Sequence, residues 1–171
     1  SGRLETAALS LELLLCKDAD RSRSIAENLR QLNETRKDMT VKGTEQAVAL
    51  IETEHMENDP VLVVYLPDCH ESIAGIIAGR LKEKYHRPSI VLTDSLEGVK
   101  GSGRSIEAYN MFHGLQQSAG WLDKFGGHPM AAGLSLKKEN IAPFRESLIA
   151  QAGLTERDFV KRIWLDLELP F

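Results

Sequence analysis

The sequence predicts an α/β fold, in which a mixed sheet with a βαβ unit and flanking helices is preceded by a long interdomain connecting helix. The βαβ unit is indicated by two apolar, β-branched runs, residues 59–67 and 88–94, which enclose a helical segment at 70–87. A crossover of this length makes the two strands parallel. The long helix is indicated by apolar residues that recur at helical spacing from Ile25 to Ile51.

The composition is that of one compact domain, with or without an attached arm. The chain has 171 residues, of which 42% are hydrophobic and 27% are charged, and its formal net charge is −4. Residues 1–59 carry 8 Lys and Arg against 12 Asp and Glu, whereas residues 60–138 carry 9 against 7. The net charge gives no global signal for a nucleic acid or a membrane, and the middle of the chain is the part least repulsive to an anion.

The two cysteines, Cys16 and Cys69, lie in unrelated contexts without metal-binding spacing. This pattern favours a reducing, cytoplasmic setting over a disulfide framework. The sequence shows no signal peptide and no apolar run long enough for a membrane helix, so no membrane partner is expected. Because the chain starts within a structural element and without Met, we expect it to be a piece of a longer protein.

The N-terminal third is expected to be helical. Residues 6–16, rich in Ala and Leu, predict a first helix, and the polar residues 17–24 predict its end. The long helix follows, with Gly43 as a candidate bend. Its length, far above the average of about 11 residues, is typical of a connection between two domains. A solvated face of a single domain is an equally good interpretation.

Elements of the α/β part follow in order. Gly75 and Gly79 are expected to let the helix of the βαβ unit lie close to the sheet. Beyond that unit we expect a glycine-rich segment at 95–105, a helix ending near Gly120, a strand at 131–136 and a helix at 139–154. Alternating apolar residues at 163–169 predict a half-buried final strand.

The segment VKGSGRS, residues 99–105, has the residue types that bind a phosphate. Lys100 and Arg104 supply charge, and Ser102 and Ser105 supply hydroxyl donors. Glycines such as Gly103 leave backbone N–H groups accessible. The segment is not a P-loop, because GxxxxGK[ST] is absent. We interpret it as a phosphate-binding loop, and an ordinary surface loop is the alternative.

A second candidate, DCHES, follows the first strand of the βαβ unit and opens its helix. Ligands of open α/β sheets bind at this edge, and a helix N-terminus attracts anions. His70 is the candidate donor there. The structural alternative is that Asp68 or Ser72 simply caps the helix.

The third candidate is DKFGGHPMAAG, residues 123–133. Gly126 and Gly127 let the backbone approach a ligand closely or turn tightly, and His128 follows them. Trp121 and Phe125 are candidates for base stacking, with core packing as the alternative. The sequence has no cluster of carboxylates and histidines for a hydrolytic metal and no nucleophile motif. It therefore indicates a phosphate binder rather than a self-sufficient catalyst.

Three segments together resemble the DHH-associated domain of RecJ-type exonucleases, within the DHH phosphoesterase superfamily. They are CHESIAGIIAGRLKEKYHRPSIVLTD, KGSGRS and FGGHPMAAGLSL. The opening GRLETAALSLELLL and the long helix resemble the connection to the catalytic DHH domain of that family. The resemblance covers nearly the whole chain. The Gly-Gly-His signature is shared by the wider superfamily, whereas the three segments together are specific to RecJ-like members.

This resemblance implies the substrate-binding domain of a 5′-to-3′ single-stranded-DNA exonuclease of DNA repair and recombination. In the family, manganese or magnesium lies in the DHH domain, so no cofactor is expected in this chain, which alone should be inactive. We expect residues 1–58 to be a helical connector from the DHH domain and 59–155 to be the DHH-associated domain. Residues 156–171 would lead toward an OB-fold. The DHH domain, the OB-fold and single-stranded DNA are the expected partners.

Single residues also receive roles from the resemblance. One set would bind backbone phosphates of the DNA strand and consists of Ser102, Arg104, Ser105, Lys100 and Arg3, and the residue patterns described above add Gly103 and His70 to it. A second set would face the scissile phosphate and consists of Gly126, Gly127 and His128, with His128 as the catalytic donor. The rival enzyme is a DHH phosphoesterase acting on short oligonucleotides or cyclic dinucleotides. The non-enzymatic rival is an interaction module in which Arg104 and His128 are structural.

Overall fold

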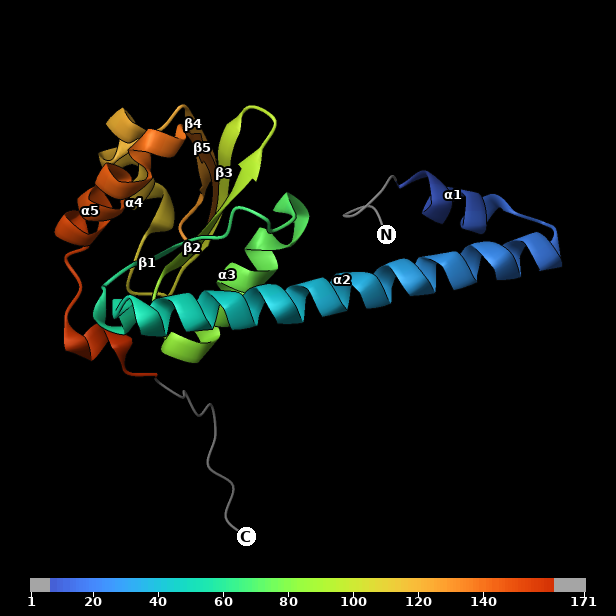
Figure 1. Ribbon diagram of the computed structural model, residues 1–171, viewed down its shortest axis with the longest axis horizontal. Coiled ribbons are helices and arrows are strands. Elements are labelled where there is room, and N and C mark those ends of the chain that lie inside the picture. The colour runs from blue at the N-terminus through green and yellow to red at the C-terminus, as the bar shows by residue number, and fades with distance from the viewer. Residues whose placement is uncertain (1–6, 162–171) are drawn as a thin grey trace, which may run out of the picture.

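Residues 7–161 are described by the computed structural model, and a five-stranded sheet lies at their centre (Figure 1). Strands β1 (Leu62–Tyr65) and β2 (Ser89–Ser95) pair in parallel. Helix α3 (Glu71–Tyr85) connects them, as the predicted βαβ unit requires. The predicted α/β class is confirmed.

Three further strands extend the sheet in the order β1-β2-β3-β5-β4. Strand β3 (Gly98–Arg104) is antiparallel to β2, and β5 (Ala131–Leu136) and β4 (Lys124–His128) continue the antiparallel part. Strands β4 and β5 form a hairpin, so β4 lies at the edge of the sheet. The sheet is mixed, as predicted, and the strand predicted at 131–136 is confirmed.

One face of the sheet, which we call the closed face, is covered by α4 (Met111–Gln117) and α5 (Ile141–Gln151) (Figure 1). Their apolar side chains, including Met111 and Phe144, pack on strand residues such as Leu134 to form a buried core. The other face carries α3, and α2 packs outside α3. The sheet is thus the middle layer of the fold.

Helix α2 (Ala19–Thr53) is a single helix of 35 residues, which confirms the predicted long helix. The Asp18 carboxylate caps it by accepting from two backbone N–H groups of the first turn. Its C-terminal half packs on α3 so closely that a Cβ at Gly43 would lie 2.6 Å from Ile77 Cδ1. Gly43 therefore permits close packing, and α2 continues through it without the predicted bend.

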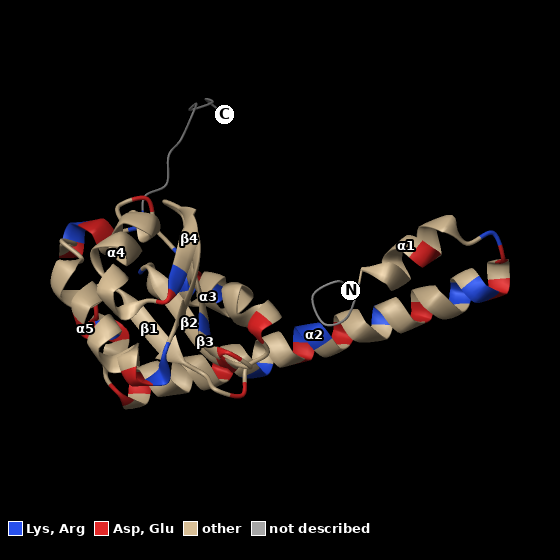
Figure 2. Ribbon diagram, turned by 90° about the horizontal axis from the view of Figure 1, so that it is seen from above, with Lys and Arg blue, Asp and Glu red and all other residues tan. Residues whose placement is uncertain are grey.

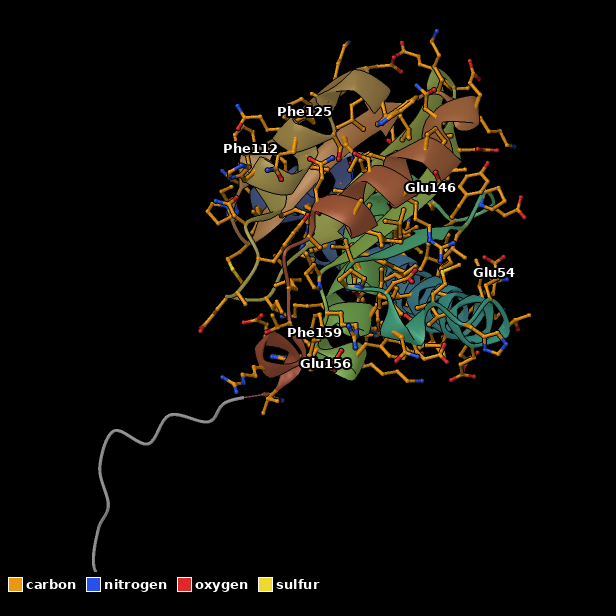
Figure 3. All side chains as sticks on the ribbon, turned by 90° about the vertical axis from the view of Figure 1, so that its left-hand side faces the viewer. Glu54, Phe112, Phe125, Glu146, Glu156 and Phe159 are labelled. Carbon is orange, nitrogen blue, oxygen red and sulfur yellow. The ribbon has the colours of Figure 1, made fainter. Side chains whose placement is uncertain are left out.

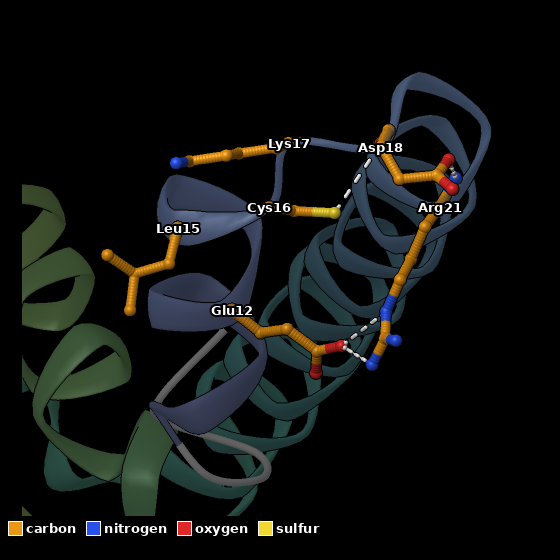
Figure 4. A pocket seen from close by; sticks show the side chains of 6 residues that line it. All are labelled: Glu12, Leu15, Cys16, Lys17, Asp18 and Arg21. Carbon is orange, nitrogen blue, oxygen red and sulfur yellow. Dashed lines mark hydrogen bonds and ion pairs between the residues drawn. The ribbon is translucent and has the colours of Figure 1, made fainter.

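The N-terminal half of α2 projects away from the sheet (Figure 1) and carries Lys and Arg interspersed with Asp and Glu (Figure 2). Ion pairs between adjacent turns, such as Arg30–Glu27, are typical of a solvated helix surface. Helix α1 (Ala8–Leu15) confirms the first predicted helix and packs back on α2. Arg21 Nε donates to Glu12 Oε1 at 2.9 Å across their junction (Figure 4).

Four short 3-10 helices complete the described chain: η1 (Met56–Asn58), η2 (Ala119–Trp121), η3 (Lys138–Asn140) and η4 (Glu156–Phe159). Asp59, which directly follows η1, accepts hydrogen bonds from two arginines. Its carboxylate accepts from Arg145 Nη2 at 2.7 Å, and its backbone carbonyl accepts from Arg87 Nη1 at 3.3 Å. The Arg87 guanidinium lies 3.7 Å from the ring centroid of Phe159, which is labelled in Figure 3. These contacts connect the segment after η1 with α5, with the residues just before β2 and with η4.

The strand predicted at 163–169 lies outside the described residues. Within 7–161, no helix combines the length and apolar character that crossing a membrane requires.

The prediction of a loop at the VKGSGRS segment is wrong, because β3 is an inner strand bonded to β2 and β5. Packing explains its glycines. A Cβ at Gly101 would lie 2.5 Å from Leu92 Cδ2, and one at Gly103 would lie 3.0 Å from Met111 Sδ. These two glycines make room for large apolar side chains on the closed face.

Candidate functional site

Nine residues of β3, β5 and β4 form one surface on the side of the sheet that carries α3, and we call this surface the open face. Directly paired residues of antiparallel strands point to the same side of a sheet. The register arranges the nine residues in three rows, Lys100–Ser135–Lys124, Ser102–Gly133–Gly126 and Arg104–Ala131–His128. Arg104 and His128, which come from separate sequence motifs, therefore share a row on one face.

The middle row of the open face has little side-chain cover, because two of its three residues are glycines. Gly126 and Gly133 are exposed and pair across β4 and β5. A Cβ at Gly126 would have no atom within 4 Å, and the nearest atom to one at Gly133 would be Gly101 O at 3.9 Å. Packing of the described residues therefore does not require glycine at either position. A bare strip of this kind lets a partner approach the main chain closely.

Gly127 is glycine for a different reason. Its φ is +149°, a value that side chains of L-residues rarely adopt, and a Cβ there would clash with Ala131 O and Ala132. The position is required by the hairpin itself. Of the two neighbouring glycines, only Gly126 belongs to the open face.

The Arg104 guanidinium is held by its own strand. Its Nη1 donates to Gly103 O at 2.7 Å and to Ser102 Oγ at 3.2 Å. No carboxylate of residues 7–161 pairs with it. A half-buried guanidinium without an anionic partner presents a planar set of donors that matches a phosphate or a carboxylate.

Two lysines end the first row of the open face. Lys100 Nζ donates to Glu71 Oε2 at 2.8 Å, and this hydrogen bond raises the pKa of Lys100, which stays protonated at neutral pH. Lys124 is exposed and has no carboxylate partner in the described part of the chain. Sequence reasoning missed Lys124, because only the strand register brings it beside the predicted residues.

Both candidate histidines use Nδ1 as an acceptor. His128 Nδ1 accepts from Met130 N at 3.4 Å, which leaves Nε2 to carry the proton of the neutral ring. His70 Nδ1 accepts from Ser72 N at 3.2 Å, so His70 itself caps α3. His70 lines a hollow of about 420 Å³ together with Glu71 and Lys100, next to the first row of the open face.

Among the residues that the structure describes, four predicted site residues do not belong to the open face: Ser105, Gly103, Gly127 and His70. Ser105 is 1% exposed, and its hydroxyl donates to Tyr109 O at 2.6 Å, so it is not free to reach a ligand. Gly103 is buried on the closed face. Arg3 lies outside the described residues.

Core packing accounts for one of the two aromatic candidates. Phe125 packs against the closed-face core, and its ring centroid lies 5.8 Å from that of Phe112 (Figure 3). It is therefore not placed to stack on a base at the open face. Trp121 is 41% exposed in η2, before β4 begins.

The described residues do not fit a metal ion. None of their His, Cys, Asp and Glu side chains form a group of three or more that could hold one. Burial raises the pKa of the Cys69 thiol, which disfavours its nucleophilic thiolate form. The chemistry that the open face offers is thus that of hydrogen-bond donors and positive charge for an anion.

Comparison with known proteins gives consistent matches. The model of the DHHA1 domain family matches residues 58–154, a range that contains the whole open face. The single-stranded-DNA-specific exonuclease RecJ of Bacillus subtilis (strain 168) is 37% identical over 170 residues, which cover 97% of this chain and 22% of that protein. RecJ of Haemophilus influenzae is 36% identical, over 99% of this chain and 31% of the relative. The chain spans less than a third of the length of these relatives.

Solved structures agree. The crystal structure of exonuclease RecJ bound to manganese superposes with a TM-score of 0.81 at 25% identity, over 91% of this chain and 38% of that one. The crystal structure of RecJ from Thermus thermophilus in complex with Mg²⁺ gives a TM-score of 0.77 at 26% identity, over 88% and 23% of the two chains. With a family model that covers more than half of its residues, the chain belongs to the DHHA1 domain family and is homologous to a segment of RecJ exonucleases.

Proposed function

We propose that this chain is the substrate-binding part of a RecJ-like 5′-to-3′ exonuclease for single-stranded DNA, and that the open face holds the DNA backbone. The observation that carries the proposal is the row in which Arg104 and His128 lie on one exposed face. Two motifs far apart in sequence thereby present donors to the same ligand. The non-enzymatic alternative, in which both side chains are structural, does not explain why Arg104 has no carboxylate partner among residues 7–161.

The chemistry of the open face suits a phosphodiester chain. Lys100, Lys124 and Arg104 supply positive charge at its margins, and Ser102 adds a hydroxyl. Between them the glycine strip offers no side chain that would read a base. Binding of this kind does not depend on the nucleotide sequence of the strand.

Cleavage requires groups that the described residues lack. We propose that a DHH domain of the same polypeptide brings manganese or magnesium to the far side of the DNA, with α2 as the connector. His128 would donate to the scissile phosphate as negative charge builds up there. His70 and Arg3 remain candidates for further phosphate contacts. The 171-residue chain alone is expected not to hydrolyse DNA when manganese is added.

The test is binding of a fluorescently labelled single strand to the chain, measured by anisotropy at several salt concentrations. We expect an affinity that falls with salt. Arg104→Ala should weaken it about tenfold, the loss of a charged hydrogen bond, and reduce the salt slope by about 0.7 per lost phosphate contact. Arg157→Ala, which removes the same charge from η4, is the matched control and should leave the affinity unchanged.

Equal weakening by Arg104→Ala and Arg157→Ala would contradict a specific role for the open face. A competition arm separates the two enzyme classes. If dinucleotides displace the labelled strand as effectively as long strands do, the short-oligonucleotide phosphoesterase becomes the better assignment.

A further inference from the structure

We infer that Gly75 of α3 is a positioning residue, whose missing side chain provides the space in which the Arg104 guanidinium is held ready for a phosphate. The inference rests on the proposed function, because it explains how the same site is kept in order. It concerns a residue of the helix rather than of the phosphate-binding strands.

The evidence is the distance between helix and strand at this point. A Cβ built on Gly75 would lie 2.7 Å from Ser102 Oγ, 2.8 Å from Arg104 Nη2 and 3.3 Å from Arg104 Cζ. The first two distances are shorter than any real Cβ contact. The ends of both phosphate-binding side chains therefore occupy the volume that a side chain at position 75 would fill.

Backbone geometry does not explain this glycine. Gly75 lies inside a regular helix and is not among the glycines with positive φ, which in the described residues are Gly98, Gly127 and Gly153. Glycine inside a helix is less favourable than alanine. Glycine at position 75 therefore leaves space beside Arg104, although it makes the helix less stable than alanine would.

The contacts around this space limit the positions that the Arg104 guanidinium can take. Nη1 is bonded to Gly103 O and Ser102 Oγ, and α3 closes the side on which Nη2 lies. The remaining donors, Nε and Nη2, make no hydrogen bond to any described residue. A side chain held in one conformation loses less entropy when it binds a ligand, so the arrangement favours phosphate binding.

Gly79 provides a matched comparison within the same helix. It lies one turn further along α3, on the same side as Gly75. A Cβ at Gly79 would meet no atom within 4 Å. The close approach predicted for both glycines is therefore present only at Gly75, beside Arg104.

Gly75→Ala should displace the side chains of Ser102 and Arg104 without destabilising the fold. The atoms that it would meet are the far ends of Ser102 and Arg104, which can rotate away, and not backbone. The helix itself becomes more favourable. Loss of binding without loss of stability is the signature of a positioning role.

The experiment compares Gly75→Ala, Gly79→Ala, Arg104→Ala and the double variant Gly75→Ala/Arg104→Ala, using the single-strand anisotropy assay and urea unfolding. We expect Gly75→Ala to bind about tenfold more weakly and with a smaller salt slope, and Gly79→Ala to bind as the native chain does. Gly75→Ala and Gly79→Ala should each have a urea midpoint at least as high as that of the native chain. The double variant should bind no more weakly than Arg104→Ala, because Gly75 acts through Arg104.

Native-like binding by Gly75→Ala, with Arg104→Ala weakened, would overturn the inference and leave the proposed function standing. A lowered urea midpoint for Gly75→Ala, or additive losses in the double variant, would also overturn it. Native-like binding by Arg104→Ala would instead overturn the proposed function.

Discussion

Strand β3 contributes residues to both faces of the sheet, and these residues have opposite surroundings on the two faces. On the closed face, α4 and α5 fill the space above β3, and Gly101 and Gly103 are small because Leu92 and Met111 press against them. On the open face, the alternating residues Lys100, Ser102 and Arg104 of β3 are left to solvent and to α3. Packing requires glycine at Gly101 and Gly103 on the first face, whereas at Gly126 and Gly133 on the second face a Cβ would meet no atom closer than 3.9 Å.

The same contrast recurs in neighbouring residues of β4. Gly127 is fixed by its positive φ and by the hairpin, whereas Gly126 faces open space. The composition of a glycine-rich motif therefore does not reveal what each glycine does. Strand register and contacts distinguish the glycines that the fold requires from those that leave the backbone exposed. Substitutions on both faces test this division.

Phe144→Ala tests the closed face. The side chain is fully buried between α5 and the sheet, so its removal leaves a cavity in the main core. We expect the free energy of unfolding to fall by about 3–5 kcal/mol. Urea unfolding followed by circular dichroism measures it. A loss below about 1 kcal/mol would mean that this face is not packed as described.

Gly127→Ala and Gly126→Ala form a matched pair within the hairpin. The first introduces a clash and a strained backbone, and should lower the free energy of unfolding by about 1–3 kcal/mol. The second meets no atom and should change it by less than about 0.5 kcal/mol. Unfolding curves of the two variants, recorded side by side, decide the matter, and similar losses would remove the distinction between the two glycines.

Lys124→Ala tests the residue that only the structure places on the open face. Loss of one phosphate contact should weaken single-strand binding about threefold to tenfold and reduce the salt slope by about 0.7. Lys84→Ala is the control, since Lys84 pairs with Glu52 of α2, away from the sheet. Anisotropy titrations measure both variants, and an unchanged slope for Lys124→Ala would remove it from the site.

Glu71→Gln should give the smallest effect. The Glu71 carboxylate pairs with Lys100 in a half-exposed ion pair, and ion pairs of this kind contribute little in water. Without this competitor, Lys100 is free for a phosphate, and binding should strengthen by no more than about fivefold. Weaker binding in the same titration would show that Glu71 orients Lys100 instead of competing for it.

Local patterns predicted much of the fold. The βαβ unit, the long helix and the strand at 131–136 follow from apolar periodicity and β-branched runs, which depend on neighbouring residues only. Strand β3 was not predictable in this way, because GSG has a low intrinsic preference for strands and its conformation is set by pairing on both sides. Tertiary pairing decided the outcome there.

The candidate site shows the same limit. Motifs identified Arg104 and His128, but their common face depends on the register of three strands. Lys124 belongs to no motif, and the difference between Gly75 and Gly79 arises from the distance between a helix and a sheet. Ser105 matched the phosphate-binding pattern, yet its hydroxyl is used inside the fold. The sequence supplies the residue types, and only the register of the assembled sheet shows which of them share the open face.

The most direct test is a nuclear magnetic resonance titration of the isotopically labelled 19.0 kDa chain with single-stranded DNA. The backbone amide signals of Ser102, Arg104, Gly126, His128 and Gly133 should shift most, while those of α5 on the closed face stay in place. Shifts concentrated on α5, with the five open-face signals unmoved, would show that DNA does not bind at the open face.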